Sequence, residues 1–150
     1  MIKFIALCRD AAMNAVFEDQ ISLISIRCPY DSIPKFVSTY SDILFLEFDD
    51  IDKPFDEQLK YRDLDGSIKY RSLTLFSLDH AKQILEFVDR NLAKGISKFV
   101  IHCDAGISRS PGVVVALKEI YNGNKKIFPA HDLYNRLVYR NLILSKSEKS

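Results

Sequence analysis

Four short apolar segments, rich in β-branched residues, predict the strands of a sheet. Each has the length of a strand and is bounded by polar or turn-forming residues. The segments are residues 2–7, 22–27, 43–48 and 97–103. The stretches between them are too long for tight hairpins, so we expect other elements to connect the strands.

Helical spacing of apolar residues supplies those connections. The alanines with Met13, Val16 and Phe17 favour a short helix between the first two strands. The clearest helix covers residues 80–95, with Asp79 placed as its N-cap and a glycine at its end. Its apolar face consists of Ala81, Leu85, Val88 and Leu92.

Two more helices are predicted after the last strand. Residues 110–123 have Pro111 in the first turn and Gly123 at the end, which is the usual order of these two residues in a helix. Residues 130–144 form the second. Its apolar positions in helical register are Leu133, Leu137, Val138 and Leu142. The polar residues 144–150 are expected to form a frayed tail.

Residues 56–74 interrupt this order. The Asp65-Gly66 pair between two tyrosine-containing segments predicts a surface hairpin. Its basic residues are expected to form a solvated face, with a substrate or partner surface as the alternative. Elsewhere strands alternate with helices, which predicts an α/β fold with a central, mainly parallel sheet flanked by helices. A chain of 150 residues fits one domain spanning residues 1–150.

Composition and cysteine spacing argue against several classes of function. The chain has 21 Lys and Arg residues against 20 Asp and Glu residues, so no basic bias indicates nucleic acid. The first apolar run is too short for a signal peptide or a membrane span. Cys8, Cys28 and Cys103 lack the CxxC spacing of a structural zinc site. We therefore expect a cytoplasmic protein without a nucleic-acid or membrane partner, in which Cys8 and Cys28 are packing residues.

Candidate chemistry concentrates in residues 101–110, IHCDAGISRS, where a strand passes through a loop into a helix. Main-chain N–H groups in front of a helix form an anion site, and Gly106 lets the backbone approach a ligand closely. Arg109 offers a planar fork that can hold two phosphate oxygens. Beside these groups Cys103 is expected to ionise readily and to attack phosphorus, giving a cysteinyl-phosphate that water later cleaves.

This segment resembles the active-site loop of the cysteine-dependent protein tyrosine phosphatases, His-Cys-x5-Arg-Ser/Thr, and AGISRS is most similar to the dual-specificity branch. The resemblance implies that Cys103 is the nucleophile and that Arg109 binds the transition state. It implies that Ser110 eases release of the thiolate, and that hydrogen bonding by His102 supports the cysteine. The main-chain amides expected to bind phosphate belong to Asp104, Ala105, Gly106, Ile107, Ser108 and Arg109.

A proton donor for the leaving group is expected on a loop after an upstream strand. The candidates are Asp49, Asp50, Asp52 and Asp56. We favour Asp50, because the FDDI stretch resembles such loops in small microbial members of the family. Strand alternation puts Asp50 on the face of Phe48 but also puts Asp52 there, so Asp52 stays open. Asp50 lies farther from Cys103 than is usual in the family, which makes the 56–74 excursion an insertion.

The leading expectation is therefore a protein phosphatase that hydrolyses phosphotyrosine, with phosphoserine and phosphothreonine as further substrates of a shallow site. It is expected to act as a monomer on phosphorylated proteins, through a phosphocysteine and without a metal or other cofactor. One alternative is a phosphate-binding module that captures such proteins without cleaving them. Another is a phosphoinositide or RNA 5′-phosphatase of the same fold, which the Asp104 carboxylate disfavours because it repels polyanions.

Overall fold

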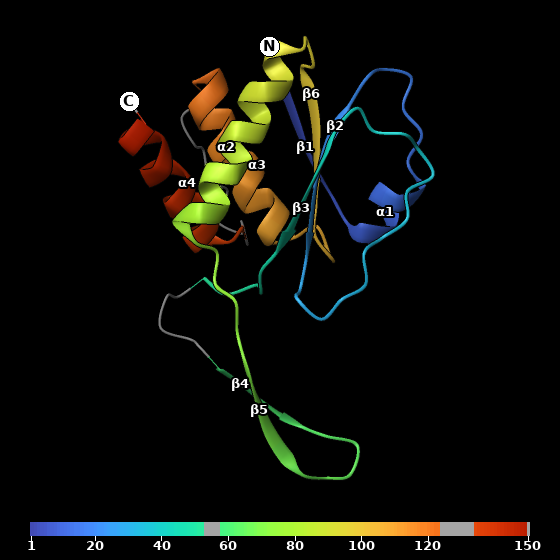
Figure 1. Cartoon of the computed structure of the whole chain (residues 1–150), viewed down its shortest axis with the longest axis vertical. Helices are drawn as coiled ribbons and strands as arrows, with labels where there is room; N and C mark the ends of the chain where they lie inside the picture. The colour runs from blue at the N-terminus through green and yellow to red at the C-terminus, as the bar shows by residue number, and fades with distance from the viewer. Residues whose placement is uncertain (53–57, 124–133, 150) are drawn as a thin grey trace.

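Four parallel strands form the central sheet in a computed structural model that describes residues 1–52, 58–123 and 134–149. They are arranged in the order β1-β6-β2-β3, and each neighbouring pair is parallel (Figure 1). The strands are β1 (Lys3–Leu7), β2 (Ser22–Arg27), β3 (Ile43–Glu47) and β6 (Lys98–His102). The predicted α/β class with a parallel sheet is confirmed, and the strands lie where the apolar segments predict them.

Of the described helices, three long ones cover one face of this sheet, and a short one lies on the other face (Figure 1). The short one is α1, and the long ones are α2, α3 and α4. Their bounds are α1 (Arg9–Asn14), α2 (Leu78–Ala93), α3 (Arg109–Asn122) and α4 (Arg136–Lys149). Within the described ranges, no helix is both long and apolar enough to cross a membrane.

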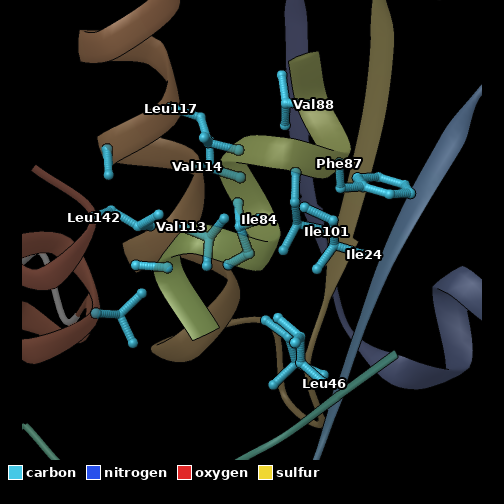
Figure 2. Close-up of a cluster of buried hydrophobic side chains, with 14 of the residues drawn as sticks. Ile24, Leu46, Ile84, Phe87, Val88, Ile101, Val113, Val114, Leu117 and Leu142 are labelled. Carbon is cyan, nitrogen blue, oxygen red and sulfur yellow. The ribbon is translucent and has the colours of Figure 1, made fainter. Parts of the chain in front are cut away.

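The main core lies between the sheet and the three long helices (Figure 2). Alternate side chains of the strands, such as Ile24 and Ile101, meet Ile84 and Phe87 of α2 there. Each of these side chains is at most 1% exposed. Full burial of such a side chain contributes about 1.5–3 kcal/mol, so this cluster fixes how the helices sit on the sheet.

A second apolar cluster covers the opposite face of the sheet. Leu23 and Val100 pack there with Tyr40, whose hydroxyl donates a hydrogen bond of 2.9 Å to the carbonyl of Ala12 in α1. Every residue of β2 is consequently buried. Because both faces of the inner strands are covered, their carboxyl ends are firmly placed, and the loops that follow them start from fixed positions.

The predicted hairpin is present as a separate two-stranded antiparallel sheet, β4 (Gln58–Arg62) and β5 (Ile68–Ser72). Its turn has Gly66 at φ +85°, in the left-handed region that favours glycine. The Asp65 carboxylate accepts a hydrogen bond of 2.9 Å from the main-chain N–H of Ser67. In Figure 1 the hairpin projects away from the rest of the molecule.

The start of α2 differs from the sequence prediction. Ser77, not Asp79, is the N-cap, and its hydroxyl accepts a hydrogen bond from the main-chain N–H of His80. The Nδ1 atom of His80 in turn accepts from the main-chain N–H of Ser77 at 3.0 Å, which completes a capping box. Asp79 lies in the first turn and accepts a hydrogen bond from Gln83 instead. The box satisfies the main-chain N–H groups of both Ser77 and His80. A cap by the Asp79 side chain alone would lack the reciprocal bond.

The end of α4 also differs from the prediction. Residues predicted as a polar tail are helical as far as Lys149, while residues 130–133 of the predicted helix lie outside the described part. The helical pattern of burial continues past Leu142: Ser145, three residues further on and therefore on the same side of the helix, is only 7% exposed. The remaining lysines and glutamate are good helix formers, so polarity here marks the solvent side of a helix rather than its end.

Two histidines make the stability of the fold depend on pH. Burial lowers the pKa of both His80 and His102 below the ordinary value. Below about pH 6.5 the unfolded chain therefore binds protons that the folded chain resists, and stability is lost as pH falls through this range. We expect the unfolding free energy to fall between pH 7.5 and pH 5.5 by at most about 1.4 kcal/mol per histidine.

The variant His80→Gln tests this assignment in thermal unfolding experiments at both pH values. Glutamine at this position also completes a capping box, so the change removes a titrating group and keeps the cap. The loss of melting temperature on acidification should be smaller in the variant than in the parent. An equal loss in both proteins would contradict a role of His80.

Candidate active site

The loop that joins β6 to α3 lies at the carboxyl edge of the sheet, where ligands of parallel α/β sheets usually bind. β6 is an inner strand, so the ends of β1 and β2 lie on either side of the loop. Gly106 has φ +73°, and a Cβ atom there would lie 2.7 Å from the main-chain N of Cys8. The main-chain N–H of Arg9 donates to the carbonyl of Asp104 at 2.9 Å. The loop is thus packed tightly against the end of β1, and only glycine fits at position 106.

Cys103 is 2% exposed, and two main-chain donors and a hydroxyl group surround its sulfur. The main-chain N–H groups of Gly106 and Ser110 lie 3.3 Å and 3.5 Å from Sγ, and the Ser110 hydroxyl lies 3.2 Å from it. Helix α3 starts at Arg109, so the positive end of its dipole lies next to the same sulfur. Donors and a dipole in this arrangement suit a sulfur that carries negative charge.

Further main-chain donors in the loop are available to a ligand. Among the described residues, nothing accepts a hydrogen bond from the main-chain N–H groups of Ala105, Ile107, Ser108 and Arg109. Consecutive free N–H groups of this kind in a loop before a helix bind oxyanions such as phosphate. The sulfur and a set of oxyanion donors therefore share one loop.

Arg109 is a buried cation, 5% exposed, that joins the loop to two neighbouring strand ends. Its Nη1 atom donates to the carbonyl of Phe48 at 2.9 Å and lies 3.4 Å from the sulfur of Cys28. Its Nη2 atom forms an ion pair of 3.2 Å with the carboxylate of Asp104. The guanidinium is thereby held in place, but its Nη2 donor is already bound to the carboxylate of Asp104 in the same chain.

Cys28 belongs to this site rather than to packing alone. Burial raises the pKa of its thiol, even though the adjacent Arg109 acts in the opposite direction. The sequence signal was its position directly after β2, because the carboxyl ends of parallel strands meet at one edge. The contact with Arg109 itself depends on side-chain packing, which the sequence pattern does not contain.

Asp50 contacts the loop directly. Its Oδ1 atom accepts hydrogen bonds from the Ser108 hydroxyl at 2.7 Å and from the side-chain amide of Asn135 at 2.9 Å. Asp52 is exposed, and Asp56 lies outside the described residues. Among the described candidates for a proton donor, Asp50 is the one whose carboxylate touches the loop.

Asp49 has a different environment, although it is the adjacent residue. It is 3% exposed and accepts hydrogen bonds from Arg71 at 2.9 Å and from the main-chain N–H of Thr74 at 2.8 Å. Burial alone would raise the pKa of the Asp49 carboxyl, but these hydrogen bonds lower it below its ordinary value. Asp49 is therefore an ionised anchor for the base of the hairpin and is poorly suited to donate a proton.

Asn135 is a component of the site that the sequence interpretation missed. Its side chain donates to Asp50 and, at 3.0 Å, to the carbonyl of Ile51, and its Oδ1 atom accepts from the main-chain N–H of Val138. Its own main-chain N–H donates to the carbonyl of Ser108 at 2.8 Å. An asparagine before a helical segment does indicate a helix start. The contacts by which Asn135 joins the active-site loop, the Asp50 segment and α4 arise only when the chain is folded.

His102 supports the loop from the strand side. Its Nδ1 atom lies 3.1 Å from the carbonyl oxygen of Cys103, which can only accept, so Nδ1 carries the proton. Its Nε2 atom then accepts a hydrogen bond of 2.6 Å from the hydroxyl of Ser25 in β2. Since burial lowers the pKa of this imidazole, the ring is neutral and holds the main chain of Cys103 in position.

The rim of the site carries an open hollow of about 290 Å³ lined by Arg9, Asp31, Ser32 and Asp104. Ligand atoms of Cys28, Asp31 and Asp104 lie within 4.8 Å of one another, which is close enough to hold a cation. Asp104 already has the Arg109 guanidinium as its positive partner, with which a metal ion would compete. We therefore assign no metal centre to this cluster.

One comparison with known proteins supports the fold. The chain is similar to the crystal structure of the human tyrosine phosphatase-like serine/threonine/tyrosine-interacting protein, with a TM-score of 0.52 and 19% sequence identity. The match covers 97% of this chain and 78% of that one. No family model matches the chain, and no match was found among curated proteins. The chain thus has a tyrosine phosphatase-like fold.

The ion pair between Arg109 and Asp104 leads to a prediction about anion binding. A phosphate at the loop must share Arg109 with this carboxylate and lie near its negative charge. We expect Asp104→Asn to bind inorganic phosphate about 3- to 10-fold more tightly, as removal of a like charge at the edge of a site implies. Calorimetric titration at fixed ionic strength measures this, with Asp10→Asn on α1 as a control of equal net charge. Weaker binding in Asp104→Asn would contradict the expectation.

Proposed function

We propose that the chain is a cysteine-dependent phosphomonoesterase that acts on phosphoproteins. The observation that carries the proposal is the convergence of two main-chain N–H groups and the Ser110 hydroxyl on the sulfur of Cys103, beside the buried guanidinium of Arg109. The tyrosine phosphatase-like fold and the His-Cys-x5-Arg-Ser sequence of the loop support the same function.

The proposed reaction has two displacements at phosphorus. In the first, the free amides of the loop and Arg109 bind the phosphate oxygens, and the Cys103 thiolate attacks phosphorus. The bond from phosphorus to the substrate oxygen breaks, and Asp50 gives its proton to that oxygen. The products of this step are the dephosphorylated substrate and a phosphocysteine.

In the second displacement water attacks the phosphocysteine. Asp50, now a carboxylate, accepts a proton from the water, and the sulfur–phosphorus bond breaks to give inorganic phosphate. The Ser110 hydroxyl, 3.2 Å from the sulfur, donates a hydrogen bond to the departing thiolate. Asn135 and Ser108 act as positioning residues, because both hydrogen-bond the Asp50 carboxylate without touching the sulfur.

The charges at the mouth of the site favour phosphoprotein substrates. The Asp104 carboxylate is 46% exposed, and Asp31 lines the same hollow. Arg9 lines the same hollow, but two carboxylates against one arginine leave this rim net negative, which disfavours the extra phosphates of an inositol lipid or an RNA end. We rank phosphotyrosine first, followed by phosphoserine and phosphothreonine, and place phosphoinositides and RNA 5′-ends after them.

A second candidate function is a phosphate-binding module without turnover. The ion pair of Arg109 with Asp104 favours it, since a donor that must bind the transition state is already occupied. Against it stand the cysteine and the carboxylate of Asp50, which a binding module does not need. Turnover by the purified protein distinguishes the two.

Substitution of Cys103 is the first test. We expect Cys103→Ser to lower the turnover of para-nitrophenyl phosphate at least about 1,000-fold, because the nucleophile is lost, and to keep binding of inorganic phosphate. Cys8→Ser is the matched control, as serine also serves as a helix N-cap there. Turnover that survives in Cys103→Ser would rule out the phosphocysteine mechanism.

The assignment of the proton donor has its own test. With an alkyl phosphate, whose leaving group needs a proton, we expect Asp50→Asn to lower kcat about 100- to 10,000-fold. With an activated aryl phosphate the loss should be much smaller. Asp52→Asn should have a far weaker effect on both substrates. The reverse order of the two variants would show that Asp50 is wrongly assigned.

A further inference from the structure

The two faces of the β4–β5 hairpin are chemically different. The strand register pairs Lys60 with Tyr70 and Arg62 with Ile68. Directly opposed residues of an antiparallel pair share a face, so these four side chains lie together. All four are exposed, and we call them the hairpin face.

The other face of the hairpin is occupied by interactions within the chain. Lys69 forms an ion pair of 2.5 Å with Asp63. Arg71 pairs with Asp49 and stacks over the ring of Tyr30 at 4.3 Å. By contrast, Lys60 and Arg62 of the hairpin face have no acidic partner in the part of the chain that the structure describes.

The hairpin also has open strand edges. In the described ranges β4 and β5 pair only with each other, and the hairpin projects from the body (Figure 1). An isolated hairpin is only marginally stable in water, and an open edge can accept a further strand. The unpaired main-chain groups suit an extended peptide, because peptides bind such edges by adding a strand.

The hairpin is connected to the candidate active site through its base. Arg71 and Thr74 both bind Asp49, which adjoins Asp50 in the sequence. At about 3.4 Å per residue, Ile68 lies roughly 10 Å along β5 from Arg71. The loop is connected to the base of β5 by contacts alone: Ser108 binds Asp50, and the adjacent Asp49 binds Arg71. The residues that flank a phosphorylated residue held in the loop would extend along this path toward the hairpin face.

Charge identifies the kind of peptide. A second copy of this chain would bring the unpaired cations of two hairpin faces together, which is unfavourable in a symmetric interface. The chain as a whole is nearly neutral, with a net charge of +1, and lacks the basic bias of a nucleic-acid binder. An acidic peptide satisfies both the cations and the open edge.

We propose that the hairpin face and an adjacent strand edge bind an extended acidic segment of the phosphoprotein substrate, roughly three to six residues from the phosphorylated residue. This proposal rests on the proposed function, whose site supplies the anchor for the phosphate. It gives the hairpin the role of selecting substrates with acidic flanking sequences. Tyr70 and Ile68 provide the apolar contact between the cations.

Binding is measured in the full chain carrying Cys103→Ser, so that the result does not depend on turnover. Fluorescence anisotropy compares two labelled phosphotyrosine peptides, one with glutamates three to six positions from the phosphotyrosine on either side and one with glutamines there. The acidic peptide should bind at least about 10-fold more tightly, with an affinity that falls as salt is added. Lys60→Glu combined with Arg62→Glu should remove this preference.

Lys35→Glu combined with Lys118→Glu is the control, because both lysines are exposed, lie outside the hairpin and give the same change of net charge. These variants should keep the preference. If the double glutamate variant of the hairpin has a lower melting temperature than the parent, Lys60→Gln combined with Arg62→Gln replaces it. This milder variant should lower the affinity ratio of the acidic to the glutamine peptide at least about two-fold.

Three outcomes would overturn the proposal. The first is equal affinity for the two peptides, and the second is a preference that survives in both hairpin variants. The third is displacement of the labelled acidic peptide by a single-stranded RNA, or by phosphatidylserine vesicles, at a lower concentration than unlabelled acidic peptide requires. Turnover of para-nitrophenyl phosphate by the parent protein is measured alongside. Its absence would count against the proposed enzyme, whereas lost peptide preference with intact turnover counts against the docking role alone.

Discussion

The hydrogen bond from the buried guanidinium of Arg109 to the carbonyl of Phe48 is the contact on which the site depends. It ties the start of α3 to the end of β3, so that the cation and the segment carrying Asp50 keep a fixed relation. A buried cation is tolerable only where its hydrogen bonds are made, and Asp104 and Cys28 supply the remaining contacts. The same constraint that satisfies the arginine thus keeps the Cys103 sulfur, the Arg109 guanidinium and the Asp50 carboxylate around one loop.

The sheet explains why these groups meet. Strands β1, β2, β3 and β6 run parallel, so each loop that follows a strand starts at the same edge. Asn135 then joins the loop of Ser108 to the segment of Asp50 from the side of α4. Its side chain binds the Asp50 carboxylate and its main-chain N–H binds the carbonyl of Ser108, so a shift of the start of α4 would act on the carboxylate and the loop together. The helix is thereby part of the site and not only of the core.

Local features were predictable from sequence, and tertiary ones were not. The strand at 22–27 and the Asp65-Gly66 turn depend on periodicity and backbone preference, which act within a few residues. The choice of Ser77 over Asp79 as helix cap depends on reciprocal hydrogen bonds with His80. From the sequence alone, both residues are equally good N-cap candidates. The contacts of Asn135 join segments far apart in the chain, so no local pattern contains them. The loop itself was recognisable because its chemistry is confined to consecutive residues.

The central claim is that phosphate is transferred to the sulfur of Cys103. Acid quenching of the protein within milliseconds of mixing with a phosphotyrosine peptide, followed by mass spectrometry of the proteolytic fragments, tests it most directly. A phosphoryl group on the fragment that contains Cys103, absent from Cys103→Ser and removed by a chase in neutral buffer, is the predicted result. Release of inorganic phosphate without any such adduct, or an adduct on another residue, would contradict the claim.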